Sequence, residues 1–410
     1  MRHSLRQSTF FLFVVVSFSL LTGCHSNVGK PEGTPVKMEY SRLLDIVDCG
    51  SYRLVTINDP WKTDRVLHRY ALVERNSSKQ ESISSPSQKD GSHEEVSDKL
   101  PDGIPPEVTV VKVPLERICV STSVHTALMQ KLGALGRVAS ICESKYMLNP
   151  AVQAEIKKGR IKDVGSGLNP SVEMIAQLRT DALLMSPFEG ASYGLLEKTG
   201  IPIIECADYM ETSALGRAEW MKFYGMLVGR EAEANALFEE VRDNYNSLKA
   251  LVASSAPNTQ SSGKGAPKRP KLLADLLSGN TWYMPGGGSC YGALYKDAGA
   301  DYNIASDKAS GSQPLSLESV LLGGRDADVW IIKYSRPENF TYASLLQENT
   351  IYSEFVPFRE HHIYGCNALL TPFYEEVPFR PDILLKDIIS ILYPNLLPDY
   401  KAVYYSPLLV

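Results

Sequence analysis

Side chains suited to binding a ligand follow several short apolar runs of the sequence, and such runs are typical of buried β-strands. Ligands of open α/β folds bind at the carboxyl ends of the strands, so these positions are the first candidates for a site. In the first half of the chain the candidates are Ser123, His125, Tyr146, Phe188 and Tyr193. In the second half they are Trp282, Tyr283, Lys333, Arg336, Tyr374 and Arg380.

The residue types in this set suit a bulky ligand. Aromatic rings offer wide apolar contact at low entropic cost, and arginine and lysine pair with anionic oxygens. Each aromatic side chain also has a plainer explanation as part of the core, because the chain contains 21 Tyr. His125 could cap its helix, and Arg336 could be a solvated loop charge.

Signatures of catalysis and of metal binding are weak. The sequence contains no GxSxG or HExxH motif, and Ser121 with His125 is its single local pair of a nucleophile and a base. No set of His, Asp and Glu residues stands out as metal ligands. We therefore expect no catalytic residues, no metal site and no resident cofactor. The run Gly286–Ser289 lacks the Lys-Ser/Thr of a phosphate-binding loop, so its glycines are expected to permit close packing at a helix start or to expose N–H groups to an anionic ligand.

Two acidic residues, Glu173 and Glu318, occupy matching places in the two halves of the chain. Each opens a predicted helix after a Pro-Ser or Leu-Ser step. The helix dipole stabilises an acidic residue in the first turn by roughly 0.3–1 kcal/mol, which is by itself a sufficient reason for both.

The N-terminus has the features of an export signal. Arg2, His3 and Arg6 precede an apolar run, and Leu-Thr-Gly-Cys follows it. Residues 1–23 are therefore predicted to be a signal peptide, and Cys24 the first mature residue, carrying lipid. This places the protein in the periplasm or cell envelope, held to a membrane by its acyl chains.

Composition narrows the partners further. The net charge is −5 and no basic stripe occurs, so nucleic acid is not expected as a partner. The six other cysteines form no CxxC pair, and their pairing stays open. They are Cys49, Cys119, Cys142, Cys206, Cys290 and Cys366.

The order of predicted elements gives an α/β fold with two lobes. Strands alternate with helices on either side of one long helical stretch, which predicts a mostly parallel sheet flanked by helices in each lobe. At 1.5 Å per residue the long helix would measure roughly 50–60 Å, enough to bridge both lobes. The predicted segments are a tether (24–37), an N-terminal β-hairpin extension (38–75), a disordered polar loop (76–106), the N-terminal lobe (107–212), the bridging helix (213–253), a flexible loop (254–270) and the C-terminal lobe (271–410).

Six segments in order, over about residues 115–400, resemble the periplasmic binding proteins for iron chelates and corrinoids, which serve ABC importers. No single motif is specific, but the order across two lobes is. The segments are ERICVSTSVHTALMQKLGALGRVASIC, KDVGSGLNPSVEMIAQLRTDALLMS, GIPIIEC, VGREAEANALFEEVRDNYNSL, GGGSCYGALYKDAGADYNIA and PLSLESVLLGGRDADVWII.

The resemblance implies a function and partners. It implies capture of a ferric siderophore or similar iron chelate between the lobes, by a monomer, and delivery to a permease with its ATPase. Glu173 and Glu318 would then meet arginines of the permease, one per lobe. A corrinoid or haem is the alternative ligand, and a bare metal ion is less expected. An envelope hydrolase, using Ser121 and His125, is the alternative from another class.

Overall fold

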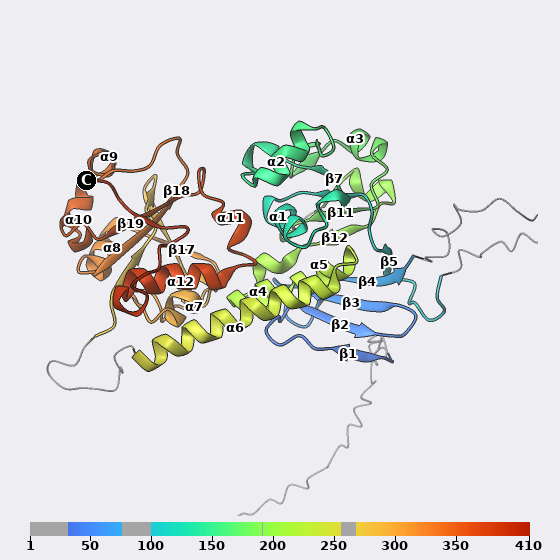
Figure 1. The fold of residues 1–410 in the computed structure, drawn as a ribbon, viewed down its shortest axis with the longest axis horizontal. Helices are drawn as coiled ribbons and strands as arrows, with labels where there is room; N and C mark the ends of the chain where they lie inside the picture. Colours follow the sequence, from blue (N-terminus) through green and yellow to red (C-terminus); the bar gives the residue numbers. More distant parts are fainter. Residues whose placement is uncertain (1–31, 76–99, 191, 256–267) are drawn as a thin grey trace, which may run out of the picture. The chain divides into compact units, whose positions relative to one another are not determined.

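The computed structural model describes residues 32–75, 100–190, 192–255 and 268–410. The predicted signal peptide, Cys24 and most of the two polar loops lie outside these residues. From Gly33 to Val410 the chain forms one unit. Its architecture is the predicted one, with two mostly parallel sheets and their flanking helices (Figure 1).

Lobe one contains a five-stranded parallel sheet in the order β12-β11-β6-β7-β8. All residues of β6, β7 and β11 are buried, as expected for a parallel sheet covered on both faces. The strands are β6 (Ile118–Val120), β7 (Val138–Ile141), β8 (Lys162–Asp163), β11 (Ala182–Met185) and β12 (Ile203–Glu205), and the helices are α1 (Ser123–Lys131), α2 (Pro150–Lys157) and α3 (Val172–Gln177). A short ribbon, β9 (Gly165–Ser166) with β10 (Asn169–Pro170), precedes α3.

Lobe two contains a sheet in the order β16-β13-β18-β19-β20, parallel except for β20. The strands are β13 (Lys271–Ala274), β16 (Asp301–Tyr302), β18 (Val329–Tyr334), β19 (Ile363–Asn367) and β20 (Ser406–Pro407). A three-stranded antiparallel ribbon is formed by β14 (Leu277–Ser278), β15 (Thr281–Pro285) and β17 (Ser312–Leu315). The helices are α7 (Cys290–Asp297), α8 (Leu317–Gly324), α9 (Tyr342–Glu348), α10 (Val356–Arg359), α11 (Phe373–Glu376) and α12 (Pro381–Leu392).

The N-terminal extension is larger than the predicted hairpin. The hairpin of β3 (Arg53–Asn58) and β4 (Val66–Glu74) is present, but β1 (Thr34–Val36), β2 (Leu44–Asp48) and β5 (Thr109–Val113) extend it to five strands. The predicted boundaries at residues 37 and 107 are therefore wrong, because β1 pairs with β2, and β5 pairs with β4. The Tyr70 hydroxyl pins this sheet to lobe one, since it donates to the Ile203 carbonyl at 2.8 Å and accepts from the Glu205 N–H at 2.9 Å.

The long helical stretch is interrupted rather than continuous over 213–253. It divides into α4 (Ala214–Glu219), α5 (Met221–Leu227) and α6 (Glu231–Ser255). Gly229 adopts a left-handed conformation with φ +62°, which ends α5 and lets the chain turn into α6. The bridging element is therefore α6, whose 25 residues measure about 38 Å.

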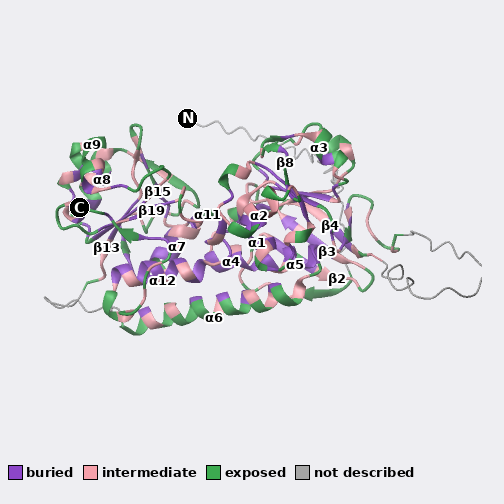
Figure 2. Cartoon of the chain, turned by 45° about the horizontal axis from the view of Figure 1, so that its top comes forward, coloured by how far each residue is buried: buried purple, intermediate pink, exposed green. Residues whose placement is uncertain are grey.

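Contacts along its length show that α6 passes from one half of the chain to the other (Figure 1). At its start, Glu231 forms an ion pair with Arg53 of the N-terminal sheet at 2.6 Å. Further along, Tyr245 donates to Asp297 of α7 at 3.0 Å, and Asn244 donates to Asp382 of α12 at 3.2 Å. One stripe of α6 is buried and the remainder is exposed or intermediate, as Figure 2 shows. Among the helices of the described residues, none is both apolar enough and long enough to cross a bilayer.

Candidate functional site

The two lobes meet where the loop after β7 reaches α11. The Leu148 N–H donates to Glu375 Oε1 at 2.6 Å, and α1 packs on α11 (Figure 1). Tyr146 lies two residues before Leu148, and Tyr374 lies directly before Glu375. Their exposed fractions are 53% and 55%. The structure thus brings these two predicted residues to one junction between the lobes.

Behind Tyr374 lies an aromatic and cationic group of lobe two. The ring of Phe373 stacks on Tyr291 of α7, with centroids 6.3 Å apart and planes at 13°. The Lys333 Nζ lies 5.2 Å from the Tyr291 centroid and 2.7 Å from Asp275 Oδ1. Burial opposes the charge on Lys333, but the carboxylate of Asp275 holds the pKa of that amine well above its usual value. Lys333 is therefore a cation that already has its counter-ion.

Sequence reasoning did not find Arg217, which lies on α4 between the lobes. Its Nε donates to Asp208 Oδ2 at 3.1 Å. Its charge also lies close enough to Tyr291 to lower the pKa of that hydroxyl, although burial raises this pKa to about 12 in all. The available signal was a lone arginine in an otherwise small and apolar stretch, SALGRA.

Asp208 joins Arg217 to lobe one. Its Oδ1 accepts from His125 Nε2 and from the Tyr224 hydroxyl, both at 2.8 Å. Burial alone would raise the pKa of Asp208, but His125, Arg217 and Tyr224 together lower it to about 2. The carboxylate is therefore ionised, and three donors occupy it.

We call these junction residues the interlobe cluster. It comprises Tyr146, Asp208, Arg217, Tyr291, Lys333 and Tyr374. Two exposed rings and a partly open cation can hold a ligand that has flat apolar faces and anionic oxygens. The described residues contain no group of His, Cys, Asp and Glu arranged to hold a metal ion.

Lobe one adds exposed aromatic residues beside the cluster. Phe188 follows β11 with an exposed fraction of 52%, and Tyr209 follows Asp208 with 38%. The Tyr209 hydroxyl donates to the Pro187 carbonyl, which ties the two loops together. The half-buried Tyr193 donates to Glu205, so this predicted residue is already engaged. Ser123 is half-buried at the start of α1.

Two predicted ligand residues are buried, and for them the prediction is wrong. Trp282 lies on β15 rather than in a loop, is 0% exposed, and donates from Nε1 to the Ala274 carbonyl at 2.9 Å. Its ring stacks on Trp330 in the core of lobe two. His125 is 1% exposed, and both ring nitrogens have partners, Thr122 and Asp208. Neither side chain has a surface that a ligand could contact.

Three further predicted residues are not brought into the cluster. Tyr283 is 49% exposed, on the ribbon that packs against α8. Arg336 pairs with Glu348 of α9. Arg380 binds Asp382 through two nitrogens and also Glu240 of α6, so it fastens α12 to α6.

Glu173 and Glu318 occupy equivalent places in the two lobes. Each follows a short strand and a serine N-cap, Ser171 or Ser316, and each lies in the first turn of its helix. Both carboxylates are exposed. The predicted geometry, with one acid per lobe at a helix start, is present.

The glycines before α7 are required for packing. A Cβ at Gly287 would lie 2.3 Å from the Ala305 carbonyl oxygen, and one at Gly288 would lie 2.4 Å from the Lys308 carbonyl oxygen. These contacts support the first of the two explanations given for the run.

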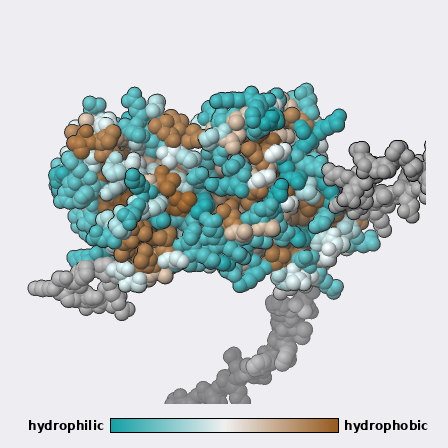
Figure 3. Space-filling view, in the orientation of Figure 1, coloured by the Kyte–Doolittle hydropathy of each residue, from teal (hydrophilic) through white to brown (hydrophobic). Residues whose placement is uncertain are grey.

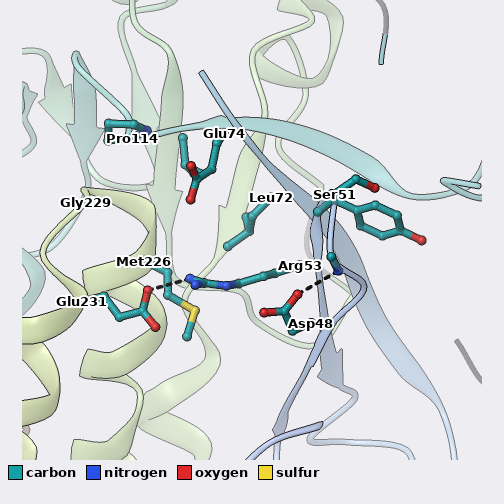
Figure 4. A pocket seen from close by; sticks show the side chains of 12 residues that line it. Asp48, Ser51, Arg53, Leu72, Glu74, Pro114, Met226, Gly229 and Glu231 are labelled. Carbon is teal, nitrogen blue, oxygen red and sulfur yellow. Dashed lines mark hydrogen bonds and ion pairs between the residues drawn. The ribbon is translucent and has the colours of Figure 1, made fainter. Parts of the chain in front are cut away.

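Three cavities lie away from the interlobe cluster. One of about 240 Å³ separates the N-terminal sheet from the α5–α6 corner, where Arg53 pairs with Glu231 (Figure 4). One of about 480 Å³ lies between α6 and α12, and one of about 350 Å³ lies beside β20. On the face drawn in Figure 3, hydrophobic residues reach the surface in separate patches among hydrophilic ones.

Comparison with known proteins agrees with this architecture. The family model described as periplasmic binding protein matches residues 118–369, more than half of the chain. Two uncharacterized lipoproteins of Methanocaldococcus jannaschii are 25% and 24% identical, over 72% and 70% of this chain and 69% and 72% of their own lengths.

Solved structures share the fold at low sequence identity. A protein of an ABC-type Fe3+-hydroxamate transport system from Saccharomonospora viridis has a TM-score of 0.52 at 18% identity, covering 68% of this chain and 94% of that one. The periplasmic heme-binding protein of Vibrio cholerae also gives 0.52 at 18% identity, covering 68% and 99%. An ABC transporter substrate-binding protein from Listeria monocytogenes gives 0.51 at 18%, covering 68% and 99%.

These findings define the class by two α/β lobes joined by a bridging helix. The chain belongs to the periplasmic binding protein family, whose members are solute-binding proteins.

Proposed function

We propose that this protein captures a ferric siderophore or a similar iron chelate between its lobes and delivers it to an ABC permease. The observation that carries the proposal is the interlobe cluster, which contains two exposed rings, Tyr146 and Tyr374, and the cation of Arg217. Iron chelates combine broad organic faces with anionic oxygens, and these groups match aromatic rings and a guanidinium.

Haem or a corrinoid is the second candidate. The exposed rings of Tyr146, Phe188, Tyr209 and Tyr374 favour it, because a planar macrocycle would lie flat against them.

A fluorescence titration tests both candidates. The full chain in detergent, with its four Trp, is titrated with ferric chelates, haemin and cyanocobalamin. Saturable quenching by a ferric chelate, with little response to cyanocobalamin, supports the proposal. If only cyanocobalamin or haemin binds, the result supports the second candidate instead. If none of the probes binds, both candidate functions are wrong.

We further propose that Glu173 and Glu318 dock the protein on the permease. One exposed acid per lobe would set the register on a two-subunit partner. The double variant Glu173→Ala with Glu318→Ala should bind ligand like the unmutated chain and lower its uptake by about tenfold or more, since two charge-assisted contacts are lost. The matched control is Glu338→Ala, another exposed acid. Loss of ligand affinity in the double variant would contradict a docking role.

We also propose that Cys24 carries the lipid. Cys24→Ser should release the protein from the membrane fraction without changing its ligand affinity, as fractionation of cells would show.

A further inference from the structure

Arg217 uses little of its guanidinium within the described part of the chain. Its Nε bonds to Asp208, but neither Nη1 nor Nη2 has a hydrogen bond with any residue in the described part of the chain. Neither nitrogen is sealed from solvent, and 18% of the side-chain surface is exposed. A planar fork of donors therefore faces the junction of the lobes.

Arg380 shows what an arginine with a purely structural role looks like in this protein. Its exposed side-chain fraction is also 18%, yet its Nε and Nη2 bond to both oxygens of Asp382 at 2.9 Å, and Nη2 also reaches Glu240 at 3.1 Å. Two carboxylates thus occupy Arg380, whereas Arg217 has one contact through one nitrogen.

Asp208 is the acid that contacts Arg217, and it also accepts from His125 and Tyr224. The neighbouring hydroxyl of Tyr291 is neutral, because burial raises its pKa to about 12. Among the described residues no carboxylate is hydrogen-bonded to Nη1 or Nη2, so these donors of Arg217 are open to an anion on a ligand.

The position of the fork is fixed. Ser213 caps α4 by accepting from the Gly216 N–H at 3.0 Å, and Asp208 holds Nε. A bidentate contact gains from such rigidity, because little side-chain entropy remains to be lost on binding.

We propose that Arg217 is the anion anchor of the site and that the ligand presents a carboxylate or catecholate group to its Nη1 and Nη2. This inference rests on the proposed function and narrows it: the chelate is anionic, and neutral hydroxamate chelates and neutral corrinoids are poor ligands.

The test is a calorimetric titration of the full chain in detergent with two groups of probes. The anionic probes are ferric citrate, a ferric tris-catecholate and haemin, whose propionates are carboxylates. The neutral probes are ferrichrome and cyanocobalamin. At least one anionic probe should bind about 10- to 100-fold more tightly than the neutral ones. The anionic probe that binds most tightly shows whether Arg217 prefers a carboxylate or a catecholate group.

Variants assign this preference to the residue. Arg217→Gln should remove the 10- to 100-fold preference, and Arg217→Lys should restore part of it, since lysine keeps the charge without the fork. The matched control, Arg325→Gln, removes an exposed arginine paired with Glu354 and should change nothing.

The outcomes distinguish the role of Arg217 as an anion anchor from the proposed function. Equal affinity of the unmutated chain for neutral and anionic chelates overturns the anchor and leaves the proposed function intact, and this measurement needs no variant to fold. Retention of the preference by folded Arg217→Gln also overturns the anchor. Failure of every chelate to bind overturns the proposed function and the anchor together.

Discussion

The two sides of α4 use charged residues in opposite ways. Arg217 and Glu219 are two residues apart, about 200° around the helix, so they point to different surroundings. Glu219 is 0% exposed and accepts from the backbone N–H groups of Glu39, Tyr40 and Ser41 at 2.8–2.9 Å, and from Lys222. Arg217 uses one nitrogen and leaves two open.

A second buried carboxylate, that of Glu211, also accepts hydrogen bonds from several groups of the chain. Glu211 accepts from the Ser41 hydroxyl, from the N–H groups of Arg42 and Leu43 at 3.0 Å, and from Trp220 Nε1. We call Glu211 and Glu219 with residues 39–43 the N-terminal clasp. A buried charge with all its partners in the chain holds the fold together, whereas one with free donors at a junction is available to a ligand.

The largest expected effect is on the clasp. Glu219→Ala leaves three backbone N–H groups and Lys222 without their acceptor, and should lower the free energy of unfolding by about 3–5 kcal/mol. Urea denaturation measures this. Glu39→Ala keeps the backbone N–H that Glu219 accepts and removes only an exposed side chain, so its effect should stay within about 0.5 kcal/mol. A loss below about 1 kcal/mol for Glu219→Ala would show that the clasp is not structural.

Arg217→Gln should have a smaller effect on stability than Glu219→Ala and a larger effect on ligand affinity. Its cost in unfolding free energy should be about 1–2 kcal/mol, since Asp208 keeps His125 and Tyr224, while the affinity for an anionic chelate falls as stated above. Glu219→Ala, in its folded fraction, should keep its affinity. If both variants lose the same stability and the same affinity, the distinction between the two sides of α4 disappears.

The aromatic residues also divide into buried ones that stabilise the fold and exposed ones that we expect to contact the ligand. Trp282→Phe should cost about 1–3 kcal/mol of stability, because a buried indole and its hydrogen bond are lost, and should leave affinity unchanged. Tyr374→Ala should weaken ligand binding by roughly fivefold through lost ring contact, with little change in stability. Parallel thermal unfolding and titration decide between the roles.

The smallest effect concerns a carboxylate with few donors. Glu205 has one side-chain donor, Tyr193, and burial raises the pKa of Glu205 from 4.5 to about 6. The folded state therefore binds this proton more tightly than the unfolded state. Stability should fall as the pH rises from about 4.5 to about 6, by at most about 2 kcal/mol.

Glu205→Gln isolates this contribution. The variant cannot ionise at this position, so its unfolding free energy should vary less across that pH window than that of the unmutated chain. Identical pH profiles for the two proteins would contradict the assignment to Glu205.

The order of the elements was available from the sequence. Runs such as ADVWIIKYS and PDILLKDIISILYP carry their period and length locally, and the structure places β18 and α12 there. Glu173 and Glu318 were found because a serine N-cap and an acid in the first turn form a local signal.

Other features depended on pairing over long distances in the chain. Trp282 was expected to follow a strand and contact the ligand, but it lies on β15, which pairs with β14 and β17, and its indole is buried in the core. The five-stranded N-terminal sheet was missed for the same reason, since β5 joins β4 across residues 75–108.

The sequence by itself determined that the chain has two α/β lobes, a helical bridge and acids at matching helix starts, because each of these is encoded in neighbouring residues. Only the tertiary structure decided which charges are saturated and which are open. Asp208 occupies one nitrogen of Arg217, whereas Arg380 is bonded to its neighbour Asp382 and also to Glu240 of α6, a partner that the local sequence does not reveal. Whether a buried charge finds partners depends on side chains that folding brings together from distant segments.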